Sequence, residues 1–156
     1  MKRALPWMLV ALQFLLLAAL VAAAIIPHER LIPESPIVVV IGVVLIVAGA
    51  VITVLGARRL GPSLTASPVP NDQNALTTTG VYALVRHPIY TGLLTAGLGV
   101  VLLAASVLSI TLWIALLTLL AVKARWEERM LRASHSGYDQ YGKTTGRFVP
   151  LVGRLR

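Results

Sequence analysis

Residues 89–122 read IYTGLLTAGLGVVLLAASVLSITLWIALLTLLAV, a run of 34 residues without a charged side chain. A single helix of this length would extend ~51 Å, which far exceeds the ~30 Å hydrocarbon core of a bilayer. Two helices of about 17 residues each would reach the lower limit for a membrane span. The run therefore indicates either one steeply tilted helix or a helical hairpin with its turn near residues 104–109.

Two further uncharged runs lie upstream, at residues 6–26 and 36–56, and each is 21 residues long. Either run is long enough to cross a bilayer. The whole chain is 57% hydrophobic and 13% charged, with a mean hydropathy of +0.83, whereas soluble domains carry about a quarter charged residues. The composition therefore predicts an integral membrane protein of the all-α class.

The positions of the basic residues decide how often the chain crosses the membrane, because Lys and Arg collect on cytoplasmic flanks. With four spans, thirteen of the fourteen basic residues fall on one side. With three spans, the basic segment after residue 123 would lie outside. We therefore predict four transmembrane helices that include the hairpin, with both termini in the cytoplasm of a prokaryotic-type plasma membrane. The expected single domain, 1–156, has spans at about 6–26, 36–56, 88–105 and 107–123, a cytoplasmic loop at 57–87 and a cytoplasmic helical tail at 124–156.

The net charge of +8 follows from this topology and from attraction to anionic lipid headgroups, so it does not indicate nucleic-acid binding. The chain has no cysteine, which excludes a disulfide, a thiolate nucleophile and a cysteine-based metal site. Its three histidines lie far apart in the sequence. We therefore expect no metal site.

The stretch Gly80–Gly92, GVYALVRHPIYTG, places an Arg, a His and two Tyr at the start of the 34-residue run. Charged groups at a membrane edge are costly and are usually functional. Pro88 is suited to open a helix because its missing N–H would be unpaired there. The free N–H groups of the next turn favour a carboxylate or phosphate. The stretch thus predicts a polar, anion-bearing ligand held where the membrane meets water.

Each side chain of this stretch also has a purely structural interpretation. His87 can bind a ligand, act as a base or hydrogen-bond at the helix start. Arg86 can neutralise a ligand carboxylate or reach lipid phosphates. Tyr82 and Tyr90 can stack on a purine or contact a cation, or they can belong to an interfacial aromatic belt.

Two acids follow the last apolar run. The spacings Lys123–Glu127 and Glu128–Arg132 place each pair on one face of a continuing helix. For Glu128 the pattern favours a solvated pair worth ~0.3–0.5 kcal/mol. Glu127 can instead turn inward, because its helical neighbours Met130 and Leu131 are apolar, and its carboxylate can then bind a ribose diol or an ammonium.

Together these elements resemble the membrane methyltransferases of the isoprenylcysteine carboxyl methyltransferase and phospholipid methyltransferase type. The resemblance covers about residues 74–150, half of the chain, with the motifs in the family's order. It is specific for the family and uninformative about the substrate. The matching elements are Leu76-Thr77-Thr78-Thr79-Gly80-Val81-Tyr82, Arg86-His87-Pro88-Ile89-Tyr90-Thr91-Gly92, Glu127-Glu128, Tyr138-Asp139-Gln140-Tyr141 and Arg147-Phe148-Val149-Pro150.

The resemblance implies S-adenosylmethionine as methyl donor, held in a cytoplasm-facing site under the C-terminal segment, and a lipophilic small molecule or lipid as acceptor. It implies Glu127, Lys123 and Arg86 as catalytic residues. Lys123 would face the acceptor where the family often has Arg, and Lys lacks the bidentate fork for a carboxylate. The cofactor-binding residues that it implies are Asn74, Ala75, Leu76, Thr77, Tyr82, His87, Pro88, Tyr90 and Glu127.

Two other functions stay open from the sequence. One is a membrane reductase similar to the C-terminal half of sterol reductases, which bind NADPH. The other is a small non-catalytic scaffold or a transporter, although none of the apolar runs contains the Asp or Glu that an ion exchanger usually needs. The oligomeric state is also open, because Gly92, Gly97 and Gly99 permit close helix approach within or between protomers.

Overall fold

The structure is a computed structural model of the chain, and it describes residues 4–26, 29–61 and 76–155. The described residues form helices and no strands, apart from an isolated bridge between Val85 and Gly146. The predicted all-α class is therefore confirmed. The elements are α1 (Ala4–Ile25), α2 (Pro36–Leu60), a 3-10 helix η2 (Gly80–Ala83), α3 (Pro88–Ala104), α4 (Val107–Ser134) and α5 (Tyr138–Thr144).

Three of these helices, α1, α2 and α4, are long and apolar enough to cross a membrane. The fourth, α3, has 17 residues, which at about 1.5 Å per residue lies at the lower limit for a span. Both α2 and α4 continue past their uncharged runs, and α4 carries its acids and basic residues on to Ser134 without a break. The arrangement is that of an integral membrane protein.

The predicted hairpin is present, and its turn consists of Ala105 and Ser106. Ala105 ends α3 in the left-handed conformation, with φ 48°, which is the usual way to close a helix. Ser106 then begins α4 through a reciprocal capping box with Ser109. The sequence favours a hairpin here because Ser106 and Ser109, whose short side chains can cap a helix start, lie in the middle of the uncharged run.

A seam of glycines joins α2 to α3. Gly42, Gly49 and Gly56 recur every seventh residue and are the buried residues of α2. Gly92 and Gly99 of α3 face them, and a Cβ at either position would lie 2.5 Å from the carbonyl oxygen of Gly49 or Gly42, respectively. The two backbones are therefore in direct contact, as in other membrane helix pairs that use small residues.

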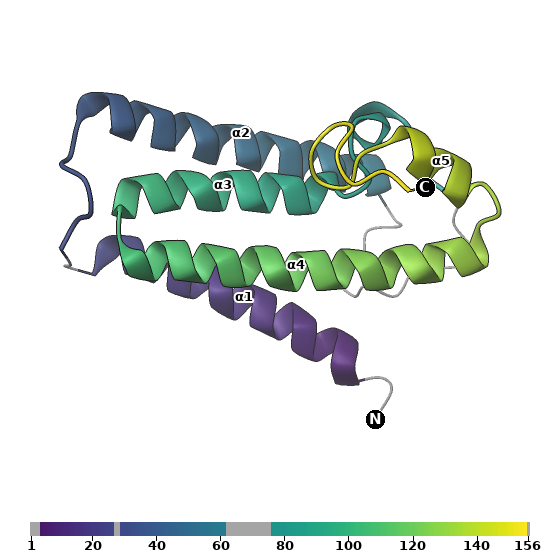
Figure 1. Ribbon diagram of the computed structural model, residues 1–156, viewed down its shortest axis with the longest axis horizontal. Coiled ribbons are helices and arrows are strands. Elements are labelled where there is room, and N and C mark those ends of the chain that lie inside the picture. The colour runs from purple at the N-terminus through teal and green to yellow at the C-terminus, as the bar shows by residue number, and fades with distance from the viewer. Residues whose placement is uncertain (1–3, 27–28, 62–75, 156) are drawn as a thin grey trace.

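The helices form an elongated bundle in which α2, α3 and α4 lie roughly alongside one another while α1 crosses beneath α4 (Figure 1). Leucines of α3 and α4, with Tyr90 and Ala124, form the buried core against α1. The α3–α4 turn lies at one end. At the other end η2, the start of α3, the end of α4, α5 and the C-terminal segment gather, and both chain termini point toward this end (Figure 1).

Candidate active site

The start of α3 is covered by the C-terminal segment. Pro88 is the first residue of α3, as the sequence predicts, and His87 is the N-cap, without a side-chain capping hydrogen bond. The backbone N–H of Arg86 donates to the Gly146 carbonyl at 2.8 Å, and that of His87 donates to the Arg147 carbonyl at 3.2 Å. These bonds place the side chains of both residues, which are buried, between α4 and the chain end.

Glu128 is the centre of a buried ionic network. Its Oε1 accepts hydrogen bonds from Nε and Nη2 of Arg86 at 3.1 and 2.9 Å. Arg147 donates to both of its oxygens, at 3.0 and 2.8 Å. The interpretation of Glu128 as half of a solvated pair with Arg132 is therefore wrong, because Arg132 pairs with Asp139 instead.

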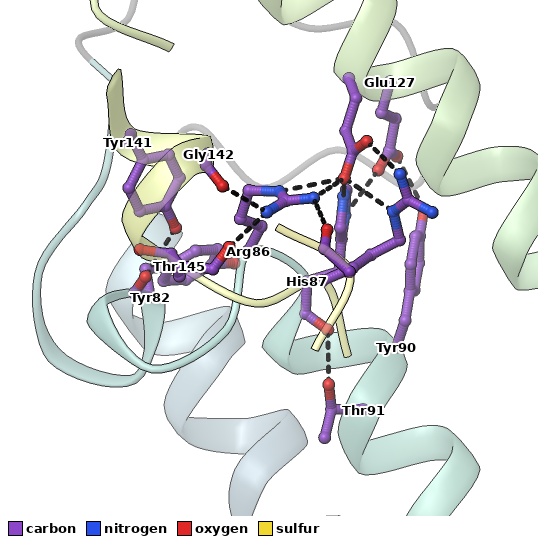
Figure 2. Close-up of polar contacts among 12 residues, drawn as sticks. Tyr82, Arg86, His87, Tyr90, Thr91, Glu127, Tyr141, Gly142 and Thr145 are labelled. Carbon is purple, nitrogen blue, oxygen red and sulfur yellow. Dashed lines mark hydrogen bonds and ion pairs between the residues drawn. The ribbon is translucent and has the colours of Figure 1, made fainter. Parts of the chain in front are cut away.

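Arg86 uses its guanidinium to fasten the end of the chain. Besides Glu128, it donates to the carbonyls of Gly142 at 3.1 Å, of Gly153 at 2.9 Å, and of Thr145. Every one of its guanidinium nitrogens has a partner in the tail or on α4 (Figure 2). The positive charge that the sequence offers to a ligand is thus already paired with Glu128.

Glu127 precedes Glu128 on α4 and contacts two residues from the start of α3. The Tyr90 hydroxyl donates to Glu127 Oε1 at 2.7 Å. His87 lies between the two acids, with Nδ1 3.3 Å from Glu127 Oε2 and Nε2 3.3 Å from Glu128 Oε1. The His87 and Tyr90 rings are stacked with centroids 5.4 Å apart. Phe148 from the tail meets both rings edge-on.

This environment changes the pKa of His87. Burial of the imidazole lowers it, but hydrogen bonds to Glu127 and then Glu128, with the charges of both, outweigh burial and raise the pKa above its usual value. The two carboxylates therefore favour the protonated form of His87.

A pH dependence of stability follows from this shift. Because the folded pKa exceeds the unfolded value of about 6.5, His87 contributes stability that is complete below pH ~6.5 and is lost as pH rises through the folded pKa. We expect the thermal midpoint in detergent to fall over this range, and the His87→Gln variant to show a flatter profile. Differential scanning fluorimetry tests this, and identical profiles for the two proteins would contradict it.

Lys123 lies one turn before Glu127 on α4, and its side chain is buried. Its ammonium donates to Gln13 Oε1 at 2.6 Å and lies 5.3 Å from the centroid of the Tyr90 ring. Gln13 comes from the middle of α1. Gln13, Lys123, Tyr90, Glu127 and His87 thus form one continuous polar cluster, to which α1, α3 and α4 contribute.

The remaining predicted residues lie around the η2 turn or precede it. Tyr82 is buried, its hydroxyl lies 3.5 Å from the Gly56 carbonyl, and its own carbonyl accepts from Tyr141 at 2.6 Å. Burial, together with the charges of Tyr141 and Glu127, raises its pKa. Leu76 and Thr77 are half-buried. Asn74 and Ala75 lie outside the described residues.

Sequence reasoning missed Gln13 and the role of Glu128. Gln13 is the sole amide in an apolar helix, and a polar group inside a span usually has a partner, so a signal existed. The indication in the sequence that Glu128 is buried was weaker, because Arg132, four residues later, is a sufficient partner on the same face of the helix.

The comparisons with known proteins place these residues in a family. The sequence profile described as "Phospholipid methyltransferase" matches residues 37–137. A protein of Oryza sativa subsp. indica named "Probable protein-S-isoprenylcysteine O-methyltransferase" is 29% identical over 146 residues, which cover 91% of this chain and 75% of the rice protein. A protein of the same name from Oryza sativa subsp. japonica matches to the same extent.

Proposed function

We propose, because this chain belongs to the phospholipid methyltransferase family, that it transfers a methyl group from S-adenosylmethionine to a lipophilic or amphiphilic acceptor at the cytoplasmic face of a membrane. The observation that carries the proposal is the cluster of Glu127, Tyr90 and His87 at one end of an apolar bundle. The C-terminal segment covers this cluster, and apolar helices with access to lipid surround it.

The residues present suit this donor. S-adenosylmethionine carries an ammonium and a sulfonium, and cations are held by carboxylates and by aromatic ring faces. The Glu127 side chain retains 19% of its exposure, so its carboxylate can still accept a ligand. Glu127, His87 and Tyr90 would hold the methionine end, and Tyr82 with the backbone of Leu76 and Thr77 would line the adenosine side. Pro88 supports the site by fixing the start of α3.

When bound, the donor supplies an electrophilic methyl group. The protein then has mainly to align the acceptor with it and to exclude water. The C-terminal segment serves the second task, because the Thr91 hydroxyl donates to the Phe148 carbonyl at 2.8 Å and thereby holds the Phe148 ring against His87 and Tyr90. Arg86 serves both tasks indirectly, as a positioning residue that fastens this segment.

The acceptor decides whether a base is needed. An amine or hydroxyl has to lose a proton as its bond to the methyl carbon forms and the carbon–sulfur bond breaks, and Glu127 or His87 would take that proton. A carboxylate acceptor needs no base. Two acceptors should be tested first. The family's name supports a phospholipid headgroup, and the name of the rice proteins supports an isoprenylcysteine. Lys123 would face the anionic group that both of them carry.

Replacing Glu127 with Gln tests the donor site. We expect the affinity for S-adenosylmethionine to fall at least about tenfold, since a hydrogen bond to a charged group contributes roughly 1.5–3 kcal/mol. Isothermal titration calorimetry in detergent measures this. The matched control is Glu34→Gln, which removes an exposed acid before α2 and should leave the affinity unchanged. A folded Glu127→Gln protein that binds the donor like wild type would refute the assignment.

A further inference from the structure

Gln13 is an unusual residue in its setting. It is the sole amide of α1, it is 8% exposed, and the side chains around it in sequence are apolar. An uncompensated amide inside a membrane helix costs free energy. Here the compensation is specific, because the carbonyl oxygen of Gln13 accepts the Lys123 ammonium at 2.6 Å.

The partners of Lys123 are neutral. Its side chain is 2% exposed, yet among the residues that the structure describes it forms no ion pair. It contacts an amide oxygen and the face of the Tyr90 ring. These contacts orient the ammonium, and the carboxylate of Glu127, one turn further along α4, acts on its charge only through space. This contrasts with Arg86 and Arg147, which both share the carboxylate of Glu128.

The Lys123 ammonium lies next to the cluster of the proposed donor site. Tyr90 contacts the Lys123 ammonium with its ring and Glu127 with its hydroxyl. The ammonium therefore lies on the side of Tyr90 that faces α1. The family profile begins at residue 37, so α1 supplies Gln13 from outside the matched region.

We propose that Gln13 is a positioning residue that holds the Lys123 ammonium toward the anionic group of the methyl acceptor, so that α1 completes the acceptor side of the site. The inference rests on the proposed function. The anionic group is the carboxylate or the phosphate of the two acceptors named above. The amide at position 13 matters because it orients the lysine and leaves its charge for the acceptor, whereas a carboxylate there would neutralise it.

The test compares Gln13→Glu and Gln13→Met with wild type in detergent. Gln13→Glu keeps the shape and supplies the missing counter-charge, and Gln13→Met removes the hydrogen bond at similar volume. Leu12→Ala, at an exposed neighbouring position of α1, is the matched control. The probes are N-acetyl-S-farnesylcysteine for a carboxylate and phosphatidylethanolamine in mixed micelles for a phosphate. Probe-induced shifts of the thermal midpoint, donor affinity by calorimetry, and KM and kcat are measured separately.

We expect Gln13→Glu to bind the effective probe at least tenfold more weakly and to raise its KM by a similar factor, while donor affinity stays within twofold. Gln13→Met should also weaken probe binding and raise KM, by a smaller factor. If Gln13→Glu does not fold, the result for Gln13→Met tests the proposal. The probe that wild type binds distinguishes carboxylate from phosphate.

The proposal is overturned if a folded Gln13 variant binds the effective probe within twofold of wild type, or if wild type binds neither probe. Failure of the proposed function looks different. Wild type would then bind the anionic probe in a Gln13-dependent manner but would bind neither S-adenosylmethionine nor S-adenosylhomocysteine.

Discussion

Replacing Glu128 with Gln is expected to free the C-terminal segment and to destabilise the protein by about 3–5 kcal/mol, the usual cost of removing one partner from a buried ion pair. The Arg86 side chain is fully buried and that of Glu128 is 4% exposed. Without the carboxylate, the cations of Arg86 and Arg147 would lie close together with only neutral acceptors. Because Arg86 also holds three tail carbonyls, its displacement would release residues 142–153.

Two measurements check this expectation. The thermal midpoint in detergent should fall sharply, and trypsin should cleave after Lys143 and Arg147 faster than in wild type. The control is Asp139→Asn, which breaks an ion pair whose side chains are 41% and 68% exposed and should cost no more than about 1 kcal/mol. If Glu128→Gln and Asp139→Asn behaved alike, the buried network would not be what holds the segment.

Replacing Gly49 with Ala is expected to separate α2 from α3. A Cβ at this position would overlap the backbone nitrogen of Ala96 and the carbonyl oxygen of Gly92. Backbone atoms inside two packed helices cannot turn aside as a flexible side chain can. The cost should therefore reach or exceed the ~3 kcal/mol upper end of typical overpacking.

Size-exclusion chromatography and thermal stability in detergent measure the effect of Gly49→Ala. Gly137→Ala is the matched control, since no atom lies within 4 Å of a Cβ built there and its φ of −83° suits any residue. A monodisperse Gly49→Ala protein with wild-type stability would show that the α2–α3 seam tolerates wider spacing.

The sequence predicted the helices and the hairpin well because both depend on local properties. Apolar run length limits the number of spans, and the basic residues select one arrangement. The α2–α3 seam was not predicted. Gly92, Gly97 and Gly99 were recognised as small residues for close approach, but the seven-residue repeat of Gly42, Gly49 and Gly56 on α2 acquires meaning only when the two helices are placed side by side.

The site was predicted in part for a similar reason. His87, Tyr90 and Glu127 were recognised from their motifs, and the structure brings them into contact. Glu128 was assigned to a solvated pair with Arg132 and Gln13 was assigned no role, because Arg86 and Lys123, which they contact, are 42 and 110 residues away in sequence. Helix periodicity describes neighbours within one helix, and in a span that is apolar on every side it does not show which face meets another helix.

The most direct test of S-adenosylmethionine-dependent methyl transfer is the binding of S-adenosylmethionine and S-adenosylhomocysteine to detergent-purified wild type and to His87→Ala, measured by calorimetry. We expect micromolar binding by wild type and its loss in His87→Ala, with the variant's fold verified by circular dichroism. A wild-type protein that is well folded and binds neither compound, even with an acceptor lipid present, would contradict the proposed function.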